Sequence, residues 1–325
     1  MKTAVKDVSK ESIAQAATLI QAGQLVAFPT ETVYGLGADA LNPTAVLQIF
    51  AAKNRPADNP LIVHIADVSE LPRLVDAIPP LAQKLIDAFW PGPLSIVFQK
   101  SALVPDQTTA GLATVVIRLP AHPDAIQLIH AAGTPIAAPS ANQSGNVSPT
   151  TAQHVQEELN GVIPLILDGG DIEFGLESTV IDCTSPQPLL LRPGSITQEQ
   201  LEKVVGPVGA PDETEKPASP GMKYKHYSPK TPVVLFTKPE NLQAALVAHP
   251  RRSCVIHHSK ALAGSGEVSV PLSPNPTHAA AALYRALRQA DALHCDVIYV
   301  ETFPKTGVGV AIMNRLEKAA SHVIG

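Results

Sequence analysis

The stretch of residues 28–65 constrains the fold of this chain more than any other. An apolar run at residues 25–28 leads directly into the turn Pro29-Thr30-Glu31-Thr32. Asn42-Pro43 predicts the start of a helix, and Pro56 stops it because proline cannot continue one. Residues 61–63 form a short apolar run that predicts a buried strand. Strand, helix and strand in this order indicate an α/β fold.

Two basic side chains stand at the end of the predicted helix. Lys53 and Arg55 are two residues apart and cannot share one solvated helix face, but at a helix end they can converge on one anion. The alternative is that they only cap the negative end of the helix. Gly35 and Gly37, which we interpret as a sharp turn or a close approach to a ligand, favour a phosphate site. His64, inside the predicted strand, must find a polar partner.

Net charge, composition and cysteine pattern exclude several classes of function. The net charge of −5 and the aromatic content of 4% argue against stable nucleic-acid binding by the whole surface. The three cysteines are isolated, which gives neither a disulfide framework nor a zinc signature. We see no signal sequence and no run long enough to span a membrane, so we expect a cytoplasmic protein without a membrane partner.

The order of segments predicts two domains. In residues 1–205 strands outnumber helices and some strand pairs lack a helical crossover, so we expect a mixed twisted sheet flanked by helices. Residues 206–232 are rich in proline, glycine and charge and read as a linker. Two tyrosines and three basic groups at residues 222–227 suggest that the linker acts as a lid. Residues 233–325 repeat the α/β pattern as a smaller, Rossmann-like domain.

Cations and hydroxyls gather at the ends of the predicted strands. Arg118 and Arg192 each end an apolar strand, and residues 139–151 form a loop dense in hydroxyls, amides and glycine. Such a loop can cradle phosphate, although one or two of its residues would suffice to cap the next helix. Alternatively, these cations pair with nearby carboxylates and form a purely structural network. Candidate carboxylates are Glu31, Asp58 and Glu177. The neutral donors beside the cations favour a ligand the size of a triphosphate.

Six segments carry a resemblance to a known family: PTETVYGLGADA, KNRPADNPLIVHI, SANQSGNVSPTTA, ESTVIDCT, LLLRPGSIT and SPGMKYKHYSP. In this order they resemble the motifs of the YrdC-like threonylcarbamoyl-AMP synthases, in their long two-domain form. The resemblance covers residues 9–232. It implies a nucleotidyltransferase that makes threonylcarbamoyl-AMP and pyrophosphate from L-threonine, bicarbonate and ATP. Other proteins would then transfer the threonylcarbamoyl group to the adenosine next to the anticodon of certain tRNAs.

The resemblance also implies residue roles. Threonine would be held by Thr32, His64, Thr114, Arg118 and Ser178. ATP would be held by Lys53, Arg55, Asn59, Ala138, Ser140, Asn142, Ser148, Arg192 and Tyr227. Lys53, Arg55 and Asn142 would carry catalysis, which is mostly positioning and electrostatics. Magnesium would arrive with the nucleotide and need no metal site of the protein.

Three other functions compete with this one. The YrdC-like module also occurs in hydrogenase-maturation proteins that transfer a carbamoyl group, but those carry a zinc-finger cysteine pattern that this sequence lacks. An RNA-binding module would use the same basic site without chemistry. A nucleotide sensor would use the last domain as its output.

Overall fold

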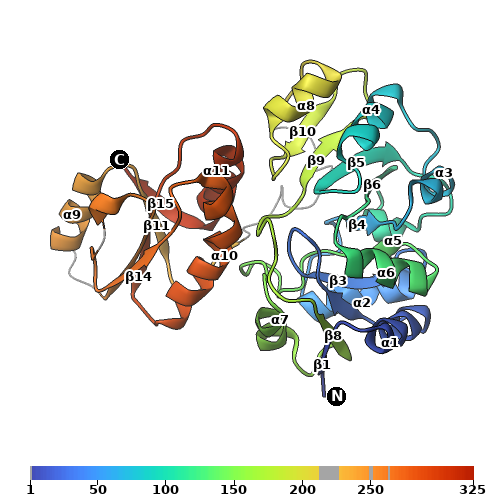
Figure 1. The fold of residues 1–325 in the computed structure, drawn as a ribbon, viewed down its shortest axis with the longest axis horizontal. Helices are drawn as coiled ribbons and strands as arrows, with labels where there is room; N and C mark the ends of the chain where they lie inside the picture. The colour runs from blue at the N-terminus through green and yellow to red at the C-terminus, as the bar shows by residue number, and fades with distance from the viewer. Residues whose placement is uncertain (1, 212–226, 249–251, 263) are drawn as a thin grey trace. The chain divides into compact units, whose positions relative to one another are not determined.

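The computed structural model describes residues 2–211, 227–248, 252–262 and 264–325, and it divides into two compact units (Figure 1). The first unit holds most of the chain up to residue 211. The second holds residues 227–325 together with two short segments, Gly145–Ser148 and Phe174–Leu176. No helix within the described ranges is long and apolar enough to cross a membrane.

A ten-stranded mixed sheet forms the centre of the first unit, in the order β1-β8-β2-β3-β7-β4-β6-β5-β9-β10. The sheet contains both parallel pairs, such as β4 with β6, and antiparallel pairs, such as β5 with β6. This confirms the predicted mixed sheet. Its strands are β1 (Ala4–Asp7), β2 (Val26–Phe28), β3 (Gly35–Asp39), β4 (Ile62–His64), β5 (Leu94–Gln99), β6 (Thr114–Arg118), β7 (Ile136–Ala137), β8 (Leu165–Asp168), β9 (Thr179–Asp182) and β10 (Leu189–Arg192).

Helices cover both faces of this sheet. In β2, Ala27 belongs to one apolar cluster, whereas Val26 and Phe28 belong to another, as expected for a strand whose side chains alternate between two buried faces. The helices are α1 (Lys10–Gln21), α2 (Pro43–Lys53), α3 (Leu71–Leu74), α4 (Pro80–Phe89), α5 (Asp106–Thr109), α6 (Pro123–Ala132), α7 (Ala152–Leu159) and α8 (Gln198–Val205), with a 3₁₀ turn at Val68–Glu70.

Local signals set both ends of α2, but the sequence predicts only the start correctly, because the helix ends at Lys53 and not at Pro56. The Asn42 side chain accepts hydrogen bonds from the N–H groups of Thr44 and Ala45, and Pro43 occupies the first turn. At the other end Asn54 adopts a left-handed conformation with φ of 50°, which ends the helix at Lys53. Lys53 is therefore fixed at the helix terminus before Pro56 is reached.

The interpretation of Gly35 and Gly37 as a sharp turn is wrong. Both lie in β3, where Gly37 pairs with Val26 of β2. A Cβ atom on Gly37 would lie 2.8 Å from side-chain carbons of both Phe28 and Ile136. Because Gly37 has no side chain, the side chains of Phe28 and Ile136 can pack directly against the backbone of β3.

A five-stranded, wholly parallel sheet forms the centre of the second unit, in the order β13-β12-β14-β11-β15. This confirms the predicted smaller α/β domain. The chain passes directly from helix to strand at Ala320. The elements are β11 (Val233–Phe236), α9 (Pro239–Ala248), β12 (Ser253–His257), a 3₁₀ turn at Lys260–Leu262, β13 (Val268–Pro271), α10 (Pro276–Ala292), β14 (Val297–Glu301), α11 (Val308–Ala319) and β15 (Ala320–Ile324).

The predicted linker at residues 206–232 falls largely on residues 212–226, which lie outside the described part. Before that gap Gly209 still pairs with the first unit, because its carbonyl accepts a hydrogen bond from the N–H of Leu190 at 2.8 Å. After the gap Thr231 already belongs to the second unit, where its N–H donates to Asp291 at 2.8 Å.

Candidate active site

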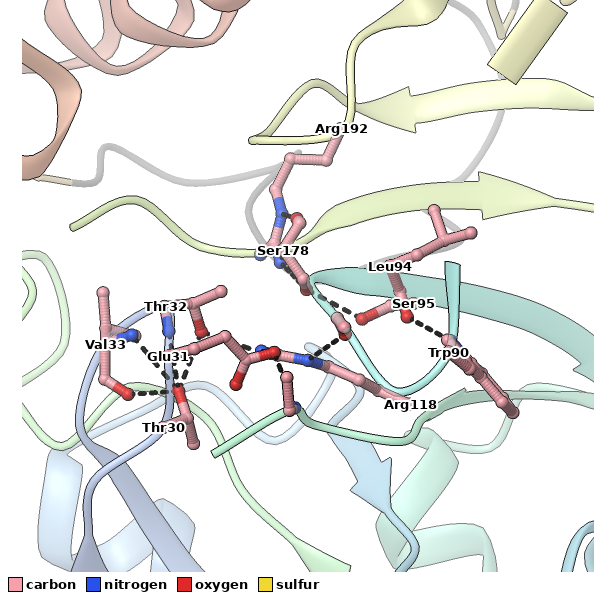
Figure 2. Close-up of polar contacts among 12 residues, drawn as sticks. Thr30, Glu31, Thr32, Val33, Trp90, Leu94, Ser95, Arg118, Ser178 and Arg192 are labelled. Atoms are coloured by element: carbon pink, nitrogen blue, oxygen red, sulfur yellow. Dashed lines mark hydrogen bonds and ion pairs between the residues drawn. The ribbon is translucent and has the colours of Figure 1, made fainter. Parts of the chain in front are cut away.

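Arg118 lies at the centre of the first group of site residues. It ends β6 and lies beside His64, the last residue of β4, in the parallel register of these strands. Its guanidinium is buried and forms an ion pair with the equally buried Glu31, at 2.6 Å from Nη2 to Oε1. Nη1 donates a hydrogen bond to Thr32 Oγ1 at 2.9 Å, and Nε donates to the Gly92 carbonyl at 3.2 Å (Figure 2). The turn after β2 thereby brings two residues against one guanidinium.

Glu31 keeps its negative charge in this buried position. Burial would raise the pKa of Glu31, but the charge of Arg118 and the N–H of Ala121, which donates at 3.0 Å, hold that pKa below its usual range. Both of these partners use Oε1. Among the described residues, Oε2 has no hydrogen-bond partner.

His64 is neutral at physiological pH. Burial lowers the pKa of His64 to about 3, and the nearby charge of Arg118 acts in the same direction. The ring meets Phe28 edge-on, with 6.4 Å between ring centroids. Its Nδ1 atom lacks a hydrogen-bond partner within the described part of the chain. A neutral imidazole with a spare polar atom can bind a neutral or polar ligand group without adding charge.

Ser178 joins this group from the start of β9. Its hydroxyl lies 2.7 Å from that of Ser95, and Ser95 is opposite Arg118 because Ile96 pairs with Ile117 in the antiparallel register. Arg192, at the end of β10, donates from Nε and Nη2 to the Ser178 carbonyl at 3.0 and 2.9 Å, and from Nη2 to its hydroxyl at 3.1 Å. Figure 2 shows these side chains turned toward one another from neighbouring strands. We call the following set the arginine group: Glu31, Thr32, His64, Ser95, Arg118, Ser178 and Arg192.

A second set surrounds Lys53 at the end of α2. Lys53 is 1% exposed, and its Nζ donates to the carbonyl oxygens of Ser140, at 2.5 Å, and Asn142. Burial, followed by the charge of Arg55, moves the pKa of Lys53 well below its usual value. In the part of the chain that the structure describes, Lys53 has no carboxylate in ion-pair contact. The buried amino group therefore has oxygen partners but no direct counterion.

Side chains near Lys53 form hydrogen bonds with neighbouring backbone carbonyls. Arg55 Nε donates to the Asn59 carbonyl at 3.3 Å, and its Nη2 donates to the Pro60 carbonyl at 3.1 Å. Asn142 Nδ2 donates to the Gln143 carbonyl at 2.7 Å. We call the following set the lysine group: Lys53, Arg55, Asn59, Ser140 and Asn142. It adjoins the residues before β4, whereas His64 of the arginine group ends that strand.

Ala138 and Thr114 are the other two predicted site residues of the first unit. The N–H of Ala138 donates a hydrogen bond to the carbonyl oxygen of Ile62 at 2.9 Å. Thr114 begins β6, whereas Arg118 ends it, so they are separated by about 13 Å at the usual rise per residue. The pairing of Ile62 with Val116 puts Thr114 at the end of β6 nearer Pro60. The structure thus does not bring Thr114 to the other four residues of the predicted threonine set.

Ser148 and Tyr227 belong to the second unit. Tyr227 is 5% exposed and stacks on Tyr284 of α10, with 5.8 Å between ring centroids, while the Arg315 guanidinium lies 5.2 Å from its ring. Its φ of 63° is rare for a residue with a side chain, so packing must hold this conformation. Arg288 donates to the Val147 carbonyl, next to Ser148. The remainder of the predicted lid lies outside the described residues.

The described residues contain no cluster of three or more His, Cys, Asp and Glu side chains placed to hold a metal ion. All three cysteines are buried and free, and burial raises the pKa of Cys183 to about 12, which makes it a poor nucleophile. Buried cations with hydroxyl and carbonyl partners are suited to binding and charge stabilisation rather than to covalent catalysis.

Sequence reasoning missed Ser95 and left Glu31 only as a possible counterion. Ser95 is a polar residue inside the apolar strand Leu94–Gln99 and is fully buried. A buried hydroxyl needs a partner, so this position was a usable signal. Which partner it has depends on the β5–β9 pairing, which no local pattern contains.

Fold and site together define a class: two-unit α/β proteins whose mixed sheet carries buried cations and hydroxyls at its strand ends. Residues 18–194 match the family model of Sua5, YciO and YrdC, described as telomere recombination. Residues 196–321 match the model described as the threonylcarbamoyl-AMP synthase C-terminal domain. The chain belongs to the threonylcarbamoyl-AMP synthase family, which confirms the resemblance seen in its motifs.

Relatives match over nearly the whole chain. The threonylcarbamoyl-AMP synthase of Bacillus subtilis (strain 168) is 50% identical over 95% of this chain and 92% of its own length. That of Pyrococcus abyssi is 46% identical over 95% and 94%. The crystal structure of P. abyssi Sua5 complexed with L-threonine superimposes with a TM-score of 0.93 at 43% identity, covering 99% of this chain and 98% of that one. The two-unit fold is therefore that of a solved relative.

Proposed function

We propose that this chain is an L-threonylcarbamoyladenylate synthase. It would combine L-threonine, bicarbonate and ATP into threonylcarbamoyl-AMP and pyrophosphate, for threonylcarbamoyladenosine modification of tRNA next to the anticodon. The observation that carries the proposal is the buried Arg118, held by Glu31 and Thr32 and set beside His64. This arrangement offers a planar fork to a carboxylate in a chain 50% identical to a named synthase.

The two groups of residues support separate roles. In the arginine group, Arg118 would bind the α-carboxylate of threonine, with Thr32, His64 and Ser178 around it. Thr114 is left out of this role because β6 separates it from Arg118. The lysine group would bind ATP and stabilise the charge of departing pyrophosphate. Ala138, Ser148, Arg192 and Tyr227 complete the proposed nucleotide set.

Threonine's neutral amine must first form a carbamate, either by attacking bicarbonate with loss of water or by attacking carbon dioxide with loss of a proton to solvent. A carbamate oxygen then attacks the α-phosphate of ATP, and pyrophosphate leaves. Mg²⁺ would be bound through the nucleotide phosphates, as is usual where ATP is a substrate. Tyr227 would shield the adenylate from water. The product would pass, in the cytoplasm, to the proteins that transfer the threonylcarbamoyl group to tRNA.

The decisive experiment measures pyrophosphate release from ATP while threonine and bicarbonate are omitted in turn. Release that requires both, with isotopically labelled bicarbonate carbon appearing in the adenylate by mass spectrometry, is the expected result. Release with threonine alone would indicate an aminoacyl-adenylate former. Activity only with carbamoyl phosphate would indicate carbamoyl transfer, and RNA binding without any ATP turnover would indicate a binding module.

A further inference from the structure

Glu31 has no part in the roles proposed so far, although it lies in the middle of the arginine group. It is 3% exposed and ionised, and Arg118 and the N–H of Ala121 both use its Oε1. Its Oε2 is buried without a hydrogen-bond partner in the described residues. A buried carboxylate oxygen without a donor costs free energy, so this atom is suited to a donor that a ligand supplies.

The charges of the group indicate what kind of ligand that is. Arg118 and Glu31 cancel each other at 2.6 Å, and His64 is neutral. A lone carboxylate bound to Arg118 would lie close to the ionised Glu31 carboxylate, and this repulsion is unfavourable in a buried site. The zwitterion of an amino acid adds no net charge and carries one group of each sign. An adjacent guanidinium and carboxylate are complementary to that pair of groups.

We propose that Glu31 binds the α-ammonium group of the amino-acid substrate while Arg118 binds its α-carboxylate. This inference rests on the proposed function, since it takes the substrate to be an α-amino acid. In this arrangement Oε1 keeps its contacts with Arg118 and the Ala121 N–H, while Oε2 accepts a hydrogen bond from the ammonium. Glu31 would thereby select amino acids against the corresponding hydroxy acids.

The role is recognition rather than proton abstraction. The charge of Arg118 holds the pKa of Glu31 below its usual range, so the carboxylate is a weak base toward an ammonium group. Once the amine has become a carbamate, its new negative charge is repelled by Glu31. Repulsion of this kind directs the carbamate away from Glu31 and favours its passage to the cationic residues.

The first test uses the wild-type protein and isothermal titration calorimetry. L-Threonine is compared with 2,3-dihydroxybutanoate of matching configuration, in which a hydroxyl replaces the ammonium. We expect the hydroxy acid to bind on the order of tenfold more weakly or worse, because a charge-assisted hydrogen bond is lost. Equal affinity of the two ligands would overturn the proposal without any question of misfolding.

The second test compares Glu31→Gln with the matched control Glu70→Gln, which removes the charge of a carboxylate paired with Arg73 at 3.1 Å on the surface. We expect Glu31→Gln to lose threonine affinity by about tenfold or more while its affinity for the hydroxy acid changes less than about threefold. The control should change neither. An equal loss of affinity for both ligands would mean that Glu31 only positions Arg118. No loss for either ligand would mean that Glu31 neither binds the ammonium nor positions Arg118. Each of these two outcomes overturns the proposal.

The two proposals fail in different ways. Wild-type protein that binds no threonine contradicts the synthase function itself. Wild-type protein that binds threonine and releases pyrophosphate, but binds the hydroxy acid equally well, contradicts only the role of Glu31.

Discussion

The arginine group and the lysine group both bury cations, but they balance the charge differently. Arg118 has an ionised carboxylate at 2.6 Å, so its own charge is compensated by a neighbouring side chain. Lys53 has two carbonyl partners, and within the described chain it makes no ion pair. The Arg118–Glu31 ion pair is suited to binding a zwitterion, which carries one group of each sign. The Lys53 amino group has no counterion and is suited to binding a polyanion, which would supply the missing negative charge. Under the proposed function, this contrast would let one sheet bind an amino acid and a triphosphate at different strand ends.

Changing Lys53 should have the largest effect on turnover. Lys53→Met keeps the bulk of the side chain and removes its charge, and we expect pyrophosphate release to fall by about 10²–10³-fold because charge on the leaving group is no longer stabilised. Lys84→Met, at an exposed position of α4, is the control and should retain wild-type rates. Near-normal turnover in Lys53→Met would remove the anion-binding role of the lysine group.

Arg118→Lys should separate the two groups. Lysine keeps the charge but loses the planar fork, so we expect the KM for threonine to rise by about 10–100-fold while the KM for ATP changes little. Steady-state kinetics with each substrate varied in turn measure both constants. A parallel rise in the two constants would show that the groups act as one site. Arg73→Lys, at the exposed ion pair with Glu70, controls for the change of residue type.

His64 should make the stability of the first unit depend on pH. Its folded pKa of about 3 lies below the unfolded value, so the unfolded chain binds more protons between these two values. The stabilisation is complete above about pH 6.5 and is lost as the pH falls, by about 1.4 kcal/mol per unit. Urea unfolding at about pH 7 and about pH 5 should therefore show a larger loss in wild type than in His64→Asn. The exposed His130→Asn should behave as wild type, and an equal loss in all three would refute a buried neutral His64.

The smallest effect is expected from the support of Tyr227 in the second unit. Tyr284→Leu retains an apolar side chain but removes the aromatic stack, which is worth about 1 kcal/mol. We expect turnover to fall about threefold to fivefold if Tyr227 shields the intermediate. Tyr299→Leu makes a similar change in β14, away from that stack, and should leave turnover unaltered. Identical rates in both variants would show that the orientation of Tyr227 does not limit the reaction.

Local sequence signals predicted those features whose causes are local. The start of α2 followed from Asn42-Pro43, and Thr151 caps α7 by accepting a hydrogen bond from the N–H of His154 at 3.2 Å. The mixed sheet followed from the excess of strands over crossover helices. The role of Gly37 was misread because it depends on the packing of Phe28 and Ile136. Neither residue is a close neighbour of Gly37 in the sequence, so no local pattern reveals this contact.

Residue types, and the order in which they occur, determined the class of this protein. Buried strands that end in arginine, a helix that ends in Lys53, and hydroxyl-rich loops are written in the sequence and already indicate an anion site. Which of them meet was decided only by strand order and register. Pairing of β4 with β6 sets His64 beside Arg118, and the same pairing puts Thr114 at the far end of its strand. The balance of charge between Glu31 and Arg118 likewise exists only after folding, because burial and proximity, not residue type, determine which charges are compensated.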